Sequence, residues 1–224
     1  MFRKFIKKKI DTILGMIGFE IRKKNLVPMH VQTIKQLFYF KRMFDRILHL
    51  QGDIIECGVG KGRSFFFLAS LIDNEGKERN LWGFDSFEGF PQPTIEDTSP
   101  RNPQKGEWKK STPEDIFYIL KKGGIKENFL KNKVKIIKGF FENTLKMYQG
   151  DSIALLHIDA DLYQSYKQVL EEFFPKVVKG GVVLFDEYNK SDWPGATLAI
   201  NDYFKKTNYK ISYDEVADKY YIIK

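Results

Sequence analysis

Acidic side chains follow two apolar stretches of the sequence, and their spacing suits the binding of a divalent cation. The first stretch ends in Asp159 and Asp161, and the second ends in Asp186 and Glu187. If both stretches are parallel strands, their carboxyl ends meet at one edge of a sheet and bring the four carboxylates together. Their mutual repulsion is relieved by an oxygen-preferring cation such as Mg²⁺, Mn²⁺ or Ca²⁺. The alternative is helix capping, which fits Asp161 but does not easily explain the pair Asp186 and Glu187.

A histidine in the first of these stretches is a candidate general base. His157 has the same strand parity as Asp159, which directs both side chains to one face. A histidine that only packs inside the sheet is the more common case. The catalytic candidates are therefore Asp159, His157 and Asp161, and a lysine from residues 86–111 also stays open as the base.

A glycine-rich turn follows an earlier apolar stretch and predicts a cofactor site. The turn holds Gly58, Gly60 and Gly62, and Glu56 lies just before it. Glycines allow a sharp turn and close approach of the backbone to a ligand, in dinucleotide sites and S-adenosylmethionine sites alike. Asp85, at the end of the next apolar stretch, is placed to accept hydrogen bonds from ribose hydroxyls. Glu56 would oppose a pyrophosphate at the helix N-terminus but suits the cationic groups of S-adenosylmethionine. A tight turn without a ligand is the alternative.

These residues can meet only if a β-sheet positions them, and the rest of the sequence shows the alternating pattern that is typical of such a sheet. Short apolar runs alternate with helical candidates, which predicts a parallel sheet with helices on both faces. The predicted strands are 53–57, 80–85, 134–138, 152–159 and 181–186, and the helices are 31–50, 63–73, 113–123, 141–148, 163–174 and 195–206. Two further short strands, 210–213 and 219–223, predict a terminal strand pair at one edge of a mixed sheet.

The segment 86–111 interrupts this alternation of predicted strands and helices. It contains four prolines, few aliphatic side chains and mixed charges, and it directly follows a predicted strand. Ligands bind beyond the carboxyl ends of strands in open α/β sheets, and long loops in compact domains often act as lids. We therefore expect a substrate lid here, with an ordinary surface loop as the alternative.

The charge distribution and the cysteine content limit which partners and which cellular compartment are expected. Residues 1–24 hold eight basic and two acidic residues, a net charge of +6, which leaves only +2 of the total +8 for the other 200 residues. The body is nearly neutral, so no nucleic-acid partner is expected. Residues 1–29 are predicted to be a basic amphipathic extension that contacts an anionic membrane surface, or else packs on the body or on a second subunit. The single cysteine, Cys57, allows no internal disulfide and fits the cytoplasm, with peripheral contact at the inner membrane face.

Three separated motifs resemble the macrocin and mycinamicin sugar O-methyltransferase family over about residues 30–224. They are Asp85-Ser86-Phe87-Glu88-Gly89-Phe90-Pro91, His157-Ile158-Asp159-Ala160-Asp161-Leu162-Tyr163-Gln164-Ser165-Tyr166, and Trp193-Pro194-Gly195. The resemblance implies a Rossmann-like class I methyltransferase domain over 30–224, with a mostly parallel seven-stranded sheet. It also implies S-adenosylmethionine as methyl donor and dependence on magnesium.

The same resemblance assigns site residues. It implies Asp159, Asp186 and Glu187 as the metal ligands, and Glu187 stands where the family usually has a second aspartate. The cofactor positions that it implies or that the turn predicts are Glu56, Gly58, Gly60, Asp85, Ser86, Phe87, Phe141 (or its neighbour Phe140) and Asp159.

The expected function is methylation of a hydroxyl on a sugar or polyol, in a surface polysaccharide or a natural-product glycoside, by a homo-oligomer. A metal-bound hydroxyl loses its proton more easily and is held at the angle for in-line attack. The alternatives are a catechol-type O-methyltransferase, a nicotinamide-dependent oxidoreductase and a non-catalytic scaffold. Glu56 and the acidic strand ends argue against the last two.

Overall fold

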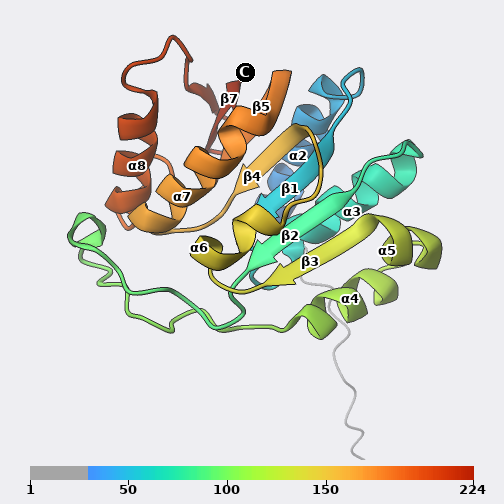
Figure 1. The fold of residues 1–224 in the computed structure, drawn as a ribbon, viewed down its shortest axis with the longest axis horizontal. Coiled ribbons are helices and arrows are strands. Elements are labelled where there is room, and N and C mark those ends of the chain that lie inside the picture. Colours follow the sequence, from blue (N-terminus) through green and yellow to red (C-terminus); the bar gives the residue numbers. More distant parts are fainter. Residues whose placement is uncertain (1–29) are drawn as a thin grey trace, which may run out of the picture. The chain divides into compact units, whose positions relative to one another are not determined.

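A single seven-stranded sheet forms the centre of the protein, which is described here from a computed structural model covering residues 30–224. The strand order is β3-β2-β1-β4-β5-β7-β6 (Figure 1). The strands are β1 (Asp53–Cys57), β2 (Leu81–Asp85), β3 (Val134–Lys138), β4 (Ile153–Ile158), β5 (Val177–Phe185), β6 (Ser212–Asp214) and β7 (Lys219–Ile223). β1 to β5 are mutually parallel, and β7 is antiparallel to both β5 and β6. The predicted mostly parallel class I sheet with an antiparallel strand near the C-terminus is confirmed.

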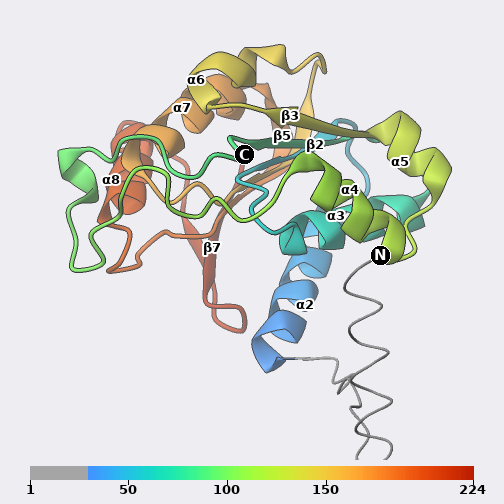
Figure 2. The same cartoon turned by 90° about the horizontal axis from the view of Figure 1, so that it is seen from below.

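Helices cover both faces of the sheet, and Figure 2 shows α6 and α7 on one side with α2 and α3 on the other. The first face carries α2 (Val31–Arg46), α3 (Arg63–Glu75), α4 (Pro113–Lys122) and α5 (Glu127–Lys133). The second carries α6 (Phe141–Thr144), α7 (Tyr163–Phe173) and α8 (Pro194–Phe204). Three short 3-10 helices complete the set: η1 (Ile95–Asp97), η2 (Leu145–Met147) and η3 (Phe174–Lys176).

The central strands are mostly apolar because both of their faces are buried. All residues of β1 and β4 are buried. Ile54 and Leu155 pack in the core under α2 and α3, whereas Ile55 and Leu156 pack in the core under α7 and α8. This two-sided burial fixes the strand ends, and with them the place of the acidic residues.

The structure differs from the sequence prediction at several boundaries. α5 was not predicted, because only Phe129 and Leu130 of its seven residues are buried and two apolar positions show no period. The predicted helix 141–148 divides into α6 and η2, and β5 begins at Val177, four residues earlier than predicted. None of the helices within residues 30–224 is long and apolar enough to cross a membrane. The predicted extension 1–29, with its membrane hypothesis, lies outside the described residues.

A buried arginine joins three segments at the amino ends of the strands, and its removal gives a first prediction. Arg79 is 3% exposed; its Nε donates to Glu75 Oε2 at 2.8 Å, and its other nitrogens donate to the carbonyls of Ile47, Leu50 and Gly52. Arg79→Met leaves the buried Glu75 carboxylate with only a 3.7 Å ion pair to the half-exposed Lys77. We expect the free energy of unfolding, measured by circular dichroism in urea, to fall by about 3–5 kcal/mol.

The control for this prediction is Lys41→Met. Lys41 pairs with Asp45 on the surface, where both side chains are about half exposed, so its loss should cost less than about 1 kcal/mol. Equal midpoints and slopes for the Arg79 variant and the native protein would contradict the assigned role.

Candidate active site

The glycine turn after β1 passes very close to the end of β4. Gly58 has φ +91°, and a Cβ there would lie 1.7 Å from the carbonyl oxygen of Asp159. The amide of Gly58 donates to the carbonyl of Phe84, and the amide of Gly60 donates to Asp85 Oδ2 at 2.8 Å. The turn is therefore held against the carboxyl ends of both β2 and β4, where the candidate site residues lie.

This close approach predicts different outcomes for two glycine substitutions. Gly58→Ala must displace the Asp159 backbone and also strains a positive φ, so we expect it to weaken S-adenosylhomocysteine binding at least about tenfold. Gly124→Ala is the matched control, because its φ of +92° carries the same backbone strain, its Cβ meets no atom within 4 Å and it does not line the cavity described below. Calorimetric titration of the two variants measures the difference. Similar affinities for both would show that the contact with Asp159 is unimportant.

A cavity of about 800 Å³ opens where the turn, the strand ends and the segment 86–111 meet. Small-molecule sites commonly have volumes of about 300–1,000 Å³. Nine of the predicted site residues line this cavity: Gly58, Gly60, Asp85, Ser86, Phe141, Asp159, Asp161, Asp186 and Glu187. The other three, Glu56, His157 and Phe87, are buried and do not line it.

The four acids at the ends of β4 and β5 form two overlapping groups that share Asp159. Asp159, Asp161 and Glu187 offer carboxylate oxygens that lie within 4.8 Å of one another, and so do ligand atoms of His157, Asp159 and Asp186. The predicted metal set of Asp159, Asp186 and Glu187 is thus divided between the two groups. Asp161 joins the first group instead of capping α7; it sits in the left-handed region at φ +60°, and the N-cap of α7 is Leu162.

Burial and mutual repulsion shift the ionisation of this cluster. Burial, and next the charge of Asp186, raises the pKa of Asp159 to about 7. Burial and the charge of Asp159 also raise the pKa of Asp161 and of Glu187 well above the usual range. Like charges this close cannot all ionise at neutral pH without a compensating cation. An all-oxygen donor set in this state fits a hard divalent ion.

Two of the acids have further partners that orient them. Tyr166 donates its hydroxyl proton to Glu187 Oε2 at 2.5 Å, and the amide of Asp161 approaches the same oxygen at 3.4 Å. Lys219, from β7, lies with its Nζ 2.5 Å from Asp186 Oδ1. Neither contact was predicted. Lys219 is 33 positions from Asp186 and reaches it only because β7 pairs with β5. Tyr166 lies in the helix directly after β4, but its contact with Glu187 depends on how α7 packs against the end of β5.

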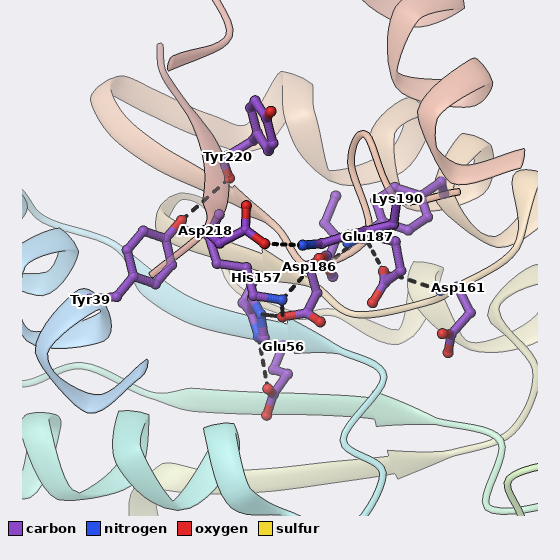
Figure 3. Close-up of polar contacts among 12 residues, drawn as sticks. Tyr39, Glu56, His157, Asp161, Asp186, Glu187, Lys190, Asp218 and Tyr220 are labelled. Atoms are coloured by element: carbon purple, nitrogen blue, oxygen red, sulfur yellow. Dashed lines mark hydrogen bonds and ion pairs between the residues drawn. The ribbon is translucent and has the colours of Figure 1, made fainter. Parts of the chain in front are cut away.

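A buried chain of polar groups lies behind the cavity wall. Glu56 and His157 are register partners on β1 and β4, and Glu56 Oε1 lies 2.8 Å from His157 Nδ1. Figure 3 shows His157 between Glu56 and Asp186, whose Oδ1 is 4.0 Å from His157 Nε2. Burial alone would lower the pKa of His157, but the hydrogen bond and charge of Glu56 raise it. The structure therefore places both residues where they hold the strand ends, not at the cavity surface.

The segment 86–111, predicted to be a lid, is a wall tethered to the domain at several points. Asp97 is 3% exposed; its Oδ1 accepts from the first amide of α7, that of Tyr163, at 2.7 Å, and its Oδ2 accepts from the amide of Thr94 at 2.8 Å. A Cβ on Gly195 would lie 2.0 Å from Asp97 Oδ1. Sequence reasoning missed Asp97, although Thr94 and Asp97 have the spacing of a capping box.

Aromatic and ionic contacts complete this wall. The guanidinium of Arg101 lies 4.4 Å from the ring centre of Trp193 and pairs with Glu107 at 2.8 Å. Phe90 packs edge-on against Trp193. In Figure 1 the green segment runs from the end of β2 toward the lower end of α8. The hydroxyl of Ser99 donates to the carbonyl of Asp192, just before that helix, at 3.0 Å. The third family motif thus serves to fix the wall of the cavity.

Comparison with known proteins now adds to this geometry. The family model described as macrocin O-methyltransferase (TylF) matches residues 34–219. A demethyldecarbamoylnovobiocin O-methyltransferase from Streptomyces niveus is 26% identical over 77% of this chain and 66% of its own length. A mycinamicin III 3''-O-methyltransferase from Micromonospora griseorubida is 27% identical over 75% of this chain and 65% of its own. The chain therefore spans slightly under two thirds of the length of these curated relatives.

A solved structure shares the fold. The crystal structure of a calicheamicin methyltransferase superposes with a TM-score of 0.77 at 24% identity, covering 87% of this chain and 80% of that one. The family match spans all three motifs that carried the resemblance in the sequence, which lie at the end of β2 and the start of the wall, at the end of β4, and at the start of α8. The chain belongs to the macrocin O-methyltransferase (TylF) family.

Proposed function

We propose that this protein is an S-adenosylmethionine-dependent O-methyltransferase that acts on a hydroxyl of a sugar or glycoside with the help of a divalent cation. The observation that carries the proposal is the meeting of the glycine turn, Asp85 and the acidic strand ends in one cavity. The names of the curated relatives, which are O-methyltransferases of glycosylated natural products, support it.

The donor site that we propose lies along the glycine turn and the end of β2. Asp85 accepts hydrogen bonds from two backbone amides, those of Gly60 at 2.8 Å and Phe87 at 2.7 Å. These bonds fix the carboxylate and leave lone pairs for the ribose hydroxyls of the donor. Phe140 and Phe141 line the same part of the cavity and offer an apolar surface for the adenine.

The residues that would hold the cation are Asp159, shared by both acidic groups, with Asp161 and Glu187 on one side and Asp186 on the other. When bound there, a divalent cation would lower the pKa of a coordinated hydroxyl and fix its orientation. Burial and the neighbouring acids raise the pKa of Asp159 and Glu187, so a bound cation would let both carboxylates ionise.

The protein's own groups orient the acceptor and take its proton. Transfer needs the hydroxyl oxygen to approach the methyl carbon opposite the leaving sulfur, and the hydroxyl proton must pass to a base. Of the candidate bases, Asp159, Asp161 and two lysines of the segment 86–111, Lys105 and Lys110, line the cavity, whereas His157 does not. We assign the proton to one of the two aspartates, because they lie at the strand ends beside the proposed cation, and we assign to His157 the positioning of Asp186 and Asp159.

The test is a methyl-transfer assay with labelled S-adenosylmethionine and a panel of glycosides and catechols, with Mg²⁺ and with chelator. We expect label on glycosides only, lost with chelator and restored by Mg²⁺. Transfer to catechols alone would overturn the acceptor class, and transfer unaffected by chelator would overturn the metal. Calorimetric binding of NADH instead of S-adenosylmethionine would overturn the reaction class. Homo-oligomer formation and membrane contact through residues 1–24 stay predictions.

A further inference from the structure

The cavity has a basic and aromatic rim to which the proposed function assigns no role. Lys105, Trp108 and Lys110 line the cavity from the segment between β2 and α4. Neither lysine has an acidic partner within 4.0 Å among residues 30–224, and the neighbouring Glu107 already pairs with Arg101. We propose, on the basis of the proposed function, that the acceptor is a sugar carrying a phosphate or diphosphate group, which Lys105 and Lys110 bind.

The placement of the cations at the cavity supports a second anionic ligand. Lys61 and Arg63 also line the cavity, and they lie in and directly after the glycine turn, where the amino-acid portion of the donor would lie. Lys105 and Lys110 lie on a different segment, so the carboxylate of the donor does not account for them. A phosphate on the acceptor would pair with these two lysines.

Trp108 lies between the two lysines in a strained and exposed conformation. Its φ is +65°, which is unusual for a bulky side chain, and its side chain is 53% exposed. Such strain is held by surrounding structure and gathers at ligand sites. An open indole face on the cavity rim is suited to stack on a sugar ring or a nucleobase.

Backbone contacts hold this rim in place, so that it is a built surface. The amide of Phe90 donates to the carbonyl of Glu107 at 2.9 Å, and the amide of Gly106 donates back to Phe90 at 3.0 Å. A Cβ on Gly89 would lie 2.2 Å from the Glu107 carbonyl oxygen, so only glycine permits this approach. On the other side, the Ser111 hydroxyl donates to the carbonyl of Gly60 and fixes Lys110 beside the glycine turn.

The experiment measures binding of inorganic pyrophosphate, UDP and farnesyl diphosphate by calorimetry to enzyme saturated with S-adenosylhomocysteine. Chelator is present throughout, so that a metal ion cannot hold the phosphates. The variants are the double substitution Lys105→Gln with Lys110→Gln, the single substitution Trp108→Ala, and the control Lys109→Gln. Lys109 is exposed and lies between the other two lysines in sequence but does not line the cavity.

We expect pyrophosphate to bind the native enzyme and to lose affinity at least about tenfold in the double variant, with no change in the control. Tighter binding of UDP that Trp108→Ala abolishes would identify a nucleotide-linked sugar. Tighter binding of farnesyl diphosphate would identify a lipid-linked one. Both results support the proposal.

Two results would overturn the inference alone: no pyrophosphate binding to enzyme that binds S-adenosylhomocysteine, or equal affinity for the double variant and the control. Glucuronate binding in place of pyrophosphate would also overturn it, in favour of a carboxylated acceptor. If S-adenosylhomocysteine itself does not bind the native enzyme, the proposed function fails instead.

Discussion

Replacing Asp159 with asparagine is expected to abolish methyl transfer while making the metal-free protein more stable. Asp159 is the carboxylate shared by both acidic groups, so its loss removes a ligand atom from each. We expect Mn²⁺ affinity, measured by electron paramagnetic resonance, to fall by more than about a hundredfold. Turnover should fall by about a thousandfold or more, because activation of the hydroxyl depends on this residue, which is also one of the two candidate bases.

The stability gain follows from the ionisation of Asp159. Burial, and next Asp186, raises the pKa of Asp159 to about 7, whereas an unfolded aspartate has a pKa of about 3.9. A raised folded pKa means that the favourable contribution is complete below about pH 4 and is lost as the pH rises through 7. Asparagine does not ionise, so in chelator the variant should melt above the native protein at pH 8 and equal it near pH 4. Each kcal/mol relieved corresponds to about 2–4 °C in Tm.

The control for this experiment is Asp151→Asn, an exposed acid in the loop before β4. It should change neither Mn²⁺ affinity nor the pH dependence of melting. An Asp159 variant that melts below the native protein at pH 8 would show that the carboxylate is paired and not repelled. Retained Mn²⁺ binding would show that the cation site lies elsewhere.

The residues that meet at the cavity were predictable because topology alone brings them together. Gly58, Asp85, Asp159 and Asp186 each follow an apolar run, and parallel strands end at the same edge of a sheet whatever their order. Which acid faces which partner was not predictable. Glu187 is turned toward Tyr166 of α7, and this contact depends on side-chain reach across the helix and strand packing.

The remaining contacts of the site depend on the strand order, which no local pattern of residues reveals. Glu56 and His157 become partners only because β1 lies beside β4 in a register that pairs them. The proline-rich segment 86–111 was correctly placed beside the site, but its tether through Asp97 to the start of α7 joins residues 66 positions apart. Polar groups that are satisfied over such distances look unremarkable in the sequence and become informative only when the fold is known.

Replacing Lys219 with methionine is expected to make the fold depend on a divalent cation. Lys219 Nζ lies 2.5 Å from Asp186 Oδ1 and also donates to the Asp186 carbonyl at 2.9 Å. Its side chain is 11% exposed and that of Asp186 is 28% exposed. Without the ammonium group, Asp186 faces Asp159 with only the His157 ring, 4.0 Å from its Oδ1, beside it. In chelator we expect the free energy of unfolding to fall by about 1–3 kcal/mol, less than for a fully buried pair.

The pH dependence separates this charge effect from lost packing. Burial would raise the pKa of Asp186, but Lys219 holds it below its usual value, and Asp186 in turn raises the pKa of Lys219. A lowered aspartate pKa gives stability that is present above about pH 4 and lost below it. A raised lysine pKa gives stability that is present below about pH 10 and lost above it. The difference between native and variant protein should therefore shrink below about pH 4 and above about pH 10. It should also grow as the pH rises through 7, where Asp159 ionises and Lys219 stabilises its charge.

Addition of Mg²⁺ then tests the link between Lys219 and the cation. Because the metal would replace the missing positive charge, it should raise the Tm of the Lys219→Met variant more than that of the native protein. Lys219→Arg, which keeps the charge, should behave as the native protein, and so should Lys190→Met, which removes a surface pair with Asp218. If Mg²⁺ stabilises native and Lys219→Met protein equally, Asp186 does not contact the cation. The group of Asp159, Asp161 and Glu187 would then be the metal centre, with Asp186 and His157 serving only to hold the end of β4.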